Sequence, residues 1–260
     1  MNTTQKVIKT FAICLAALII LSIINGVAHL VTSAFSFNND VNINETYNSD
    51  INNIKIDVGT TNMVIKYGDT FSITAENVSK EFKIKEEGNT LVIKEKNITI
   101  FGNKKSSHTT ITIPNDLNNL SIDIGAGKLE LSDITSNNFS LNQGAGKVVI
   151  TNLISNNTTI DGGAGELHIT SSKLQNLDLE LGAGKCYYNG ILLGNNKIDQ
   201  GVGELILDLY RDDYTIKASK GLGSITINGE SYSKDVTVGE GINDIKIDGG
   251  IGSIIINTNK

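Results

Sequence analysis

The sequence has little of what most catalytic, metal-binding and nucleic-acid-binding sites require. Its two cysteines, Cys14 and Cys186, are too few for a disulfide framework, and neither lies in a CxxC or mixed Cys/His metal spacing. The three histidines, His29, His108 and His168, complete no Ser/His/Asp or Cys/His set, and no P-loop or dinucleotide fingerprint occurs. Lys and Arg number 22 against 28 Asp and Glu, a balance unsuited to holding phosphate backbones. We therefore expect neither enzyme activity nor a nucleic-acid partner.

Charge is also absent from a long stretch near the start of the sequence. Residues 10–31 form an apolar run, and the only charges before Asp40 are Lys6 and Lys9. As a helix, the run would reach about 33 Å, enough to cross a bilayer core. Lysines on the N-terminal flank predict a cytoplasmic N-terminus and an extracytoplasmic C-terminal domain, in a single-pass protein of the cell membrane. A cleaved signal peptide is the alternative.

The remaining sequence has many glycines, and they recur at a fixed interval. Gly-x-Gly triplets step by 19, 19, 19, 19, 20 and 29 residues. Glycine suits tight corners because it tolerates positive φ and lets neighbouring backbones approach closely. The predicted corner glycines of the regular coils are Gly125, Gly127, Gly144, Gly146, Gly163, Gly165, Gly182, Gly184, Gly201 and Gly203, followed by the pairs Gly221/Gly223 and Gly250/Gly252.

Apolar residues alternate on both sides of each corner, so each repeat holds two short strands. The position four after the first corner glycine is occupied by Leu129, Val148, Leu167, Cys186, Leu205, Ile225 and Ile254. A unit of this size cannot bury its own apolar face, but stacked units close a continuous core. The predicted fold is therefore all-β: a single-stranded parallel β-solenoid of about 19-residue Gly-x-Gly coils, preceded by one N-terminal transmembrane helix.

The sequence divides into an anchor, a linker and an ectodomain. Residues 1–35 are the predicted cytoplasmic stub and transmembrane anchor, and residues 36–50 the linker. Residues 51–260 are the β-solenoid, with irregular first coils or a cap at 51–119 and regular coils at 120–260. A column of asparagines at the 19-residue step marks a second corner, where Asn adopts the left-handed region or forms a side-chain ladder: Asn138, Asn157, Asn176 and Asn195.

Two acidic features resemble metal sites. Asp precedes Gly-Gly-x-Gly at residues 161–165 and 248–252, as in nonapeptide calcium repeats, but Leu167 and Ile254 stand where those repeats place a ligand. An acidic column also lies two places before the corners. It is interpreted as a solvated face with lysines nearby rather than as a cation site: Asp123, Asn142, Asp161, Glu180, Asp199, Ser219 and Asp248. We expect no metal and no cofactor.

One outward column is less polar than its neighbours. Five places after the first corner glycine stand Glu130, Val149, His168, Tyr187, Ile206, Thr226 and Ile255. Exposed apolar stripes mark contact surfaces more often than chance allows. The predicted partner-contact stripe is Val149, His168, Tyr187 and Ile206. In the alternative interpretation, another part of the chain covers this column.

Residues 110–114 (TITIP) and 120–131 (LSIDIGAGKLEL), followed by further Gly-x-Gly coils, carry a family resemblance. The chain resembles the bacterial putative-adhesin β-solenoid family. That family is similar to the toastrack-type domains of membrane-anchored cell-envelope stress proteins of Gram-positive bacteria. The resemblance spans about residues 51–260 and implies fold and compartment more than mechanism.

Together these features predict a non-catalytic scaffold or sensor module of the cell envelope. Its expected partners are the membrane, through the N-terminal helix, and an envelope membrane protein or cell-wall polymer; self-association is also possible. The alternative is an adhesin that binds an external surface or polysaccharide. An aromatic content of 5% argues against strong stacking on sugars.

Overall fold

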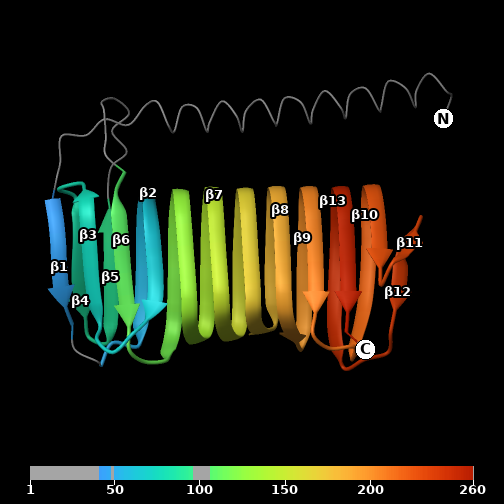
Figure 1. The fold of residues 1–260 in the computed structure, drawn as a ribbon, viewed down its shortest axis with the longest axis horizontal. Coiled ribbons are helices and arrows are strands. Elements are labelled where there is room, and N and C mark those ends of the chain that lie inside the picture. Colours follow the sequence, from blue (N-terminus) through green and yellow to red (C-terminus); the bar gives the residue numbers. More distant parts are fainter. Residues whose placement is uncertain (1–40, 48–49, 96–105, 260) are drawn as a thin grey trace, which may run out of the picture. The chain divides into compact units, whose positions relative to one another are not determined.

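All the regular secondary structure that the structure describes is β-strand. The computed structural model describes residues 41–47, 50–95 and 106–259, all within a unit comprising residues 39–98 and 106–260. Its strands join one sheet that winds into successive coils (Figure 1). Among these residues no helix is long and apolar enough to cross a membrane. The predicted anchor at residues 1–35 lies outside the described residues.

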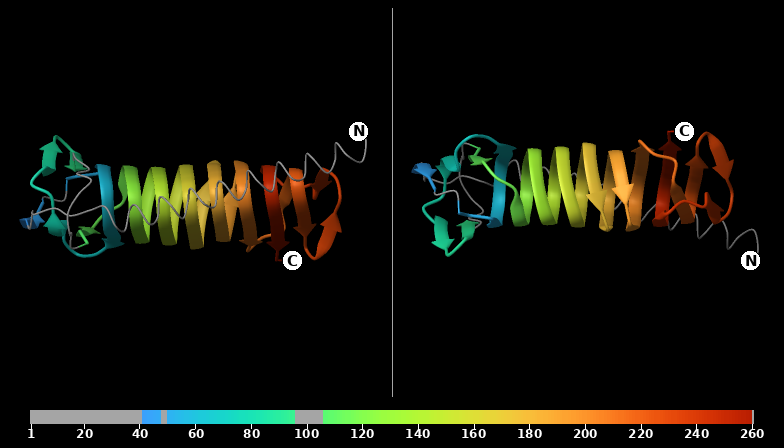
Figure 2. Two further views of the ribbon diagram at one scale, coloured as in Figure 1. Left: turned by 90° about the horizontal axis from the view of Figure 1, so that it is seen from above. Right: turned by 90° about the horizontal axis from the view of Figure 1, so that it is seen from below.

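The regular coils are built from three long strands, β7 (Leu117–Gln175), β8 (Leu177–Leu193) and β9 (Asn195–Leu209). Neighbouring coils pair in parallel at the 19-residue step, so that Ile160 lies beside Leu179 and Leu179 beside Ile198. Figure 2 shows the coils from both sides, with blue and green strands at one end and orange and red ones at the other. The prediction of an all-β fold with parallel stacking is confirmed.

The core runs along the inside of the coils. At the position four residues after the first corner glycine, every side chain is at most 3% exposed: Leu129, Val148, Leu167, Cys186, Leu205, Ile225 and Ile254. Burial raises the pKa of the Cys186 thiol to about 12, so this thiol stays neutral and packs as a small apolar group. In the next inward column, the hydroxyl of the buried Tyr188 lies within hydrogen-bond distance of two carbonyl oxygens, that of Ile191 at 2.8 Å and that of Ser172 at 3.1 Å, and donates its one hydrogen between them.

The corners require glycine because neighbouring coils nearly touch there. Gly165 has φ of 141°. A Cβ on it would lie 1.9 Å from the carbonyl oxygen of Gly146, and one on Gly163 would lie 2.4 Å from that of Gly144. Atoms cannot approach so closely, so any side chain here would push two coils apart. The corner in β2 (Asn53–Tyr67) is Gly59-Thr60-Thr61, in register with Gly125-Ala126-Gly127.

The asparagine column forms a ladder along the stack. Asn138 Nδ2 donates to Asn119 Oδ1 over 2.9 Å, and Asn157 Nδ2 donates to Asn138 Oδ1 over 3.0 Å. Of the four predicted asparagines, Asn176 has left-handed φ, at 51°. A separate column, eight places after the first corner glycine, also has positive φ: Asp133, Asn152, Ser171 and Gly190. The asparagine column therefore pairs side-chain amides between coils, and at Asn176 it also takes the left-handed conformation.

The order of the last coils differs from their order in the sequence. After β9, the chain skips one position to form β10 (Tyr214–Ile227), and β13 (Asn243–Thr258) then lies between β9 and β10, parallel to both (Figure 1). The intervening strands β11 (Glu230–Tyr232) and β12 (Val236–Val238) pair antiparallel with β10. The steps of 20 and 29 residues mark this rearrangement.

The first coils are also out of order. β2 lies between β7 on one side and β5 (Thr90–Glu95) and β6 (His108–Ile113) on the other. β4 (Phe82–Glu87) forms an antiparallel hairpin with β5. β3 (Ser72–Val78) pairs antiparallel with β6, and β1 (Val41–Thr46) with β3. Antiparallel strands thus cover both ends of the parallel stack, where unpaired backbone groups would otherwise face outward.

Candidate binding face

The predicted contact residues lie side by side on the second strand of consecutive coils. His168 pairs in register with Tyr187, and Tyr187 with Ile206. Val149 belongs to the coil before His168, since Lys147 and Glu166, and Thr151 and Thr170, contact each other across the same two coils. All four side chains are half-buried, and the rings of His168 and Tyr187 lie 6.3 Å apart between centroids.

The insertion of β13 lengthens this column. Ile255 lies in register with Ile206 and is half-buried as well. In the sequence these two residues are two Gly-x-Gly units apart, because the β10 unit intervenes. We call the column Val149, His168, Tyr187, Ile206 and Ile255 the apolar stripe.

A charged column borders the stripe on its corner side, and most of its members neutralise one another. Lys147 Nζ lies 3.0 Å from Glu166 Oε2, and Lys185 Nζ 3.4 Å from Glu204 Oε2. The hydrogen bond from Lys147 lowers the pKa of the Glu166 carboxyl, with a smaller contribution from His168. Paired charges leave the flank polar but close to neutral.

A polar column borders the stripe on the other side. Asn257 Nδ2 donates to Asp208 Oδ1 over 2.7 Å, which ties the inserted β13 to β9. Partial burial, followed by a hydrogen bond to Asp208, raises the pKa of the Tyr187 phenol. The Tyr187 side chain is half-buried beside the His168 ring, so part of it stays accessible for contact with a partner.

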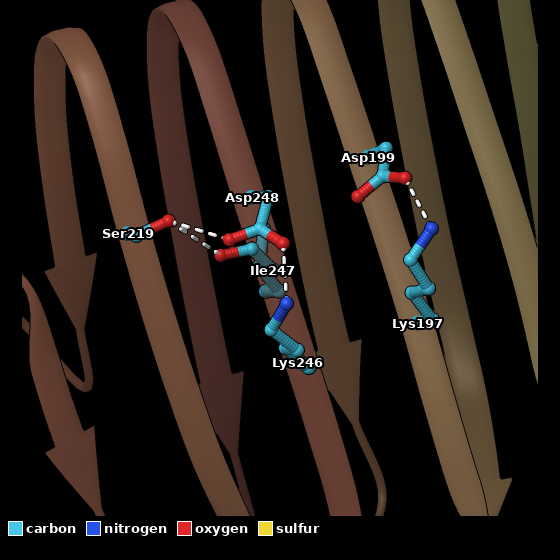
Figure 3. A network of polar contacts seen from close by, with 6 residues as sticks. All are labelled: Lys197, Asp199, Ser219, Lys246, Ile247 and Asp248. Atoms are coloured by element: carbon cyan, nitrogen blue, oxygen red, sulfur yellow. Dashed lines mark hydrogen bonds and ion pairs between the residues drawn. The ribbon is translucent and has the colours of Figure 1, made fainter.

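The acidic column lies on the other strand of the coil, before the corner. The inserted β13 places Asp248 beside Asp199, in line with Glu180 and Asp161, and these four carboxylates line an open hollow of about 520 Å³. Lysines on the same strands pair with two of them: Lys197 Nζ lies 2.5 Å from Asp199 Oδ2, and Lys246 Nζ 2.7 Å from Asp248 Oδ2 (Figure 3). Within the described residues no three His, Cys, Asp or Glu side chains are grouped to hold a metal ion.

Asp248 gives this column a measurable pH response. Its pKa is lowered by the hydrogen bond from Lys246 and then by that from Ser219 Oγ (2.7 Å; Figure 3). A carboxyl with a lowered folded-state pKa stabilises the fold above its unfolded-state pKa, and this stabilisation is lost as pH falls through the folded-state value.

We predict that Asp248→Asn lowers the free energy of unfolding at pH 7 by less than about 1 kcal/mol, because the pair is solvent-screened. The difference from the unaltered chain should shrink as the pH falls below about 4 and vanish only below the lowered folded-state pKa of Asp248. Urea unfolding at a series of pH values measures both, with Lys246→Met as the matched variant that removes the partner charge. An equal loss at pH 7 and pH 3 would contradict this electrostatic assignment.

Solved structures of low sequence identity resemble this chain to different degrees. The crystal structure of a putative adhesin from Bacteroides fragilis NCTC 9343 matches 85% of this chain and 98% of its own, at 17% identity and a TM-score of 0.56. That of a putative cell adhesion protein from Clostridium sporogenes ATCC 15579 matches 85% of this chain and 100% of its own, at 17% identity and a TM-score of 0.35. No curated protein matches by sequence.

At such low identity the first of these structures shows a shared fold alone. A family model described as Toastrack DUF4097 matches residues 51–247, which includes β2, the regular coils, β10 and the start of β13. The family resemblance read from residues 110–131 is thus confirmed. The chain belongs to the toastrack DUF4097 family.

Proposed function

We propose that this chain is a non-catalytic binding module of the cell envelope, a scaffold or sensor that contacts a membrane protein or wall polymer through the apolar stripe. The observation that carries the proposal is the stripe itself. Five consecutive coils present half-exposed side chains that are apolar or aromatic, apart from His168, between a charged column that pairs internally and a polar column. Burying such a surface against a partner costs little desolvation free energy, and the apolar contact itself is favourable.

The anchor completes this proposal. Residues 10–31 would hold the domain at the outer face of the membrane, with Lys6 and Lys9 on the cytoplasmic side. Anchoring keeps the stripe near membrane-embedded partners and raises their effective concentration at that surface. The stack of coils would then act by holding the apolar stripe at a fixed distance from the membrane, without turnover of a substrate.

An adhesin that binds an external surface or polysaccharide is the second candidate. Two solved structures with some likeness to this chain are named as a putative adhesin and a putative cell adhesion protein. Tyr187 is the single aromatic ring of Phe, Tyr or Trp type in the stripe, which favours a protein over a sugar ligand, since carbohydrate sites are typically lined by aromatic faces.

We predict that Tyr187→Glu together with Ile206→Glu abolishes partner binding and leaves the fold intact, because both side chains are outward and only half-buried. Binding is measured as recovery of envelope proteins and wall fragments with the tagged chain. Ser140→Glu and Thr159→Glu, on exposed positions of adjacent coils outside the stripe, form the matched control. If the stripe variant is folded and recovers the same material as the control, the stripe is not the contact surface.

A further inference from the structure

The inserted strand β13 separates β9 and β10, which follow one another in the sequence. β10 follows β9 at a 20-residue step, close to the 19 residues that separate adjacent coils elsewhere. The inward columns of the two strands match: Leu205 corresponds to Ile225 and Leu207 to Ile227, all of them buried. During synthesis β10 exists before β13, so β9 is the neighbouring coil first available to it. Insertion of β13 is therefore a separate step that holds β9 and β10 apart.

β13 is paired on both edges and buried on its inner face. It pairs with β9 from Asp244 to Thr258 and with β10 from Asn243 to Ile256, in parallel on both edges. Four isoleucines fill the core column on its inner face: Ile245, Ile247, Ile254 and Ile256, each at most 2% exposed. Hydrogen bonds to side chains fix the register in both halves of β13: Ser219 Oγ donates to Asp248 Oδ1 over 2.7 Å, and the Thr258 amide donates to Asn228 Oδ1 over 2.8 Å.

Like charges oppose this arrangement on the outer face. Lys246 lies in register between Lys197 and Lys217, and Asp248 lies beside Asp199. Like charges on adjacent strands destabilise their pairing, although the Lys–Asp pairs within each strand offset part of this effect. Like charges thus meet on both columns at this junction and at no other junction of the regular coils, so isoleucine burial and strand pairing, rather than charge complementarity between strands, hold β13 in place.

The connection that leads to β13 combines the short strands β11 and β12 with glycines at its bends. It spans residues 228–242 and includes Gly229 and Gly239, both with positive φ. It crosses the β9–β10 connection closely, where the Asn243 amide donates to the Asp213 carbonyl oxygen over 3.2 Å and a Cβ on Gly241 would lie 1.9 Å from the Asp213 carbonyl carbon. Just before β13, Ile242 is 84% exposed, which is unusual for so large an apolar side chain.

We propose that the space between β9 and β10 is a strand-acceptor site and that its ligand in trans is β13 of a second copy of this chain. The contacts of β13 with β9 and β10 are the same whether β13 comes from its own chain or from another. Exchange changes the path of residues 228–242, so its cost is confined to the pairing of β11 and β12 with β10 and to the other contacts of this connection. Protein concentration then decides between the two arrangements. This inference is independent of the apolar stripe as a partner-binding surface.

The test uses register partners on β9 and β13 that face outward, Asp208 and Asn257. Asp208→Cys and Asn257→Cys are introduced into separate full-length chains, each with Cys14→Ser, while Cys186 is kept because it is buried. The two chains are mixed, unfolded in urea, refolded in detergent at low and high concentration, and oxidised. A disulfide between the two different chains can form in register only if β13 of one enters the acceptor site of the other.

The matched control is the pair Lys185→Cys and Glu204→Cys, register partners on β8 and β9 that do not involve β13. We expect the β9/β13 mixture to give several-fold more mixed-chain disulfide than the control at high concentration, with the excess lost at low concentration. An excess of a synthetic peptide of residues 243–260 should also suppress it, by filling the acceptor site. Equal yields from the two mixtures, or a yield that neither dilution nor peptide lowers, would overturn the proposal.

Discussion

Replacing Gly165 with alanine is expected to destabilise the stack by about 3 to 5 kcal/mol, near the upper limit for a single substitution. Two effects add. Gly165 has φ of 141°, which alanine rarely adopts, and the new Cβ would lie 1.9 Å from the Gly146 carbonyl oxygen, so the coils must separate at the corner. Urea unfolding followed by circular dichroism measures the loss.

Gly88 provides the control for backbone conformation alone. Its φ is 65°, and a Cβ on this residue would have no atom within 4 Å. Gly88→Ala should therefore cost only about 1 to 2 kcal/mol, the penalty of a left-handed alanine. Equal losses at Gly88 and Gly165 would show that contact between coils is not what makes the corner glycines necessary.

Ending the chain after Ile242 is expected to remove one complete rung and to loosen one end of the stack selectively. The four buried isoleucines of β13 contribute roughly 6 to 12 kcal/mol of burial if the remaining coils do not rearrange. Because each coil contacts only its neighbours, amide hydrogen exchange should lose protection in β10 and on β9, while β7 keeps it. Hydrogen exchange with mass spectrometry resolves these regions.

A chain that ends after Thr258 is the control for this deletion, since it removes only residues beyond β13. It should exchange like the full chain. Uniform loss of protection along the whole stack would contradict nearest-neighbour stability. Unchanged protection in β10 would show that β13 does not support it.

The repeat could be predicted from the sequence because period and burial agree at each level. A Gly-x-Gly corner every 19 residues, with apolar residues in matching places, is enough by itself to specify parallel coils. The asparagine ladder followed from the same spacing. The corner in β2 was hidden because Gly59-Thr60-Thr61 lacks the second glycine, whose place is taken by Thr61, with its hydroxyl 3.4 Å from the Ser107 carbonyl oxygen.

The order of the last coils could not be predicted from the column pattern. Ile225 and Ile254 are equally suited to stack on Leu205, since every coil presents the same kind of residue in the same place. Only the unequal steps of 20 and 29 residues carry information about the order, and they do not say which coil lies inside. The composition of the apolar stripe depends on that order, because Ile255 joins Ile206 only through the insertion.

Binding through the apolar stripe is tested most directly by photo-crosslinking in the cell from a reactive residue at position 187, with one at position 159 as control. Adducts are identified by mass spectrometry. We predict an adduct with one envelope membrane protein, or with wall polymer, that forms from position 187 and not from position 159. Identical adducts from the two positions, or none from position 187, would contradict the assignment of the stripe as the contact surface.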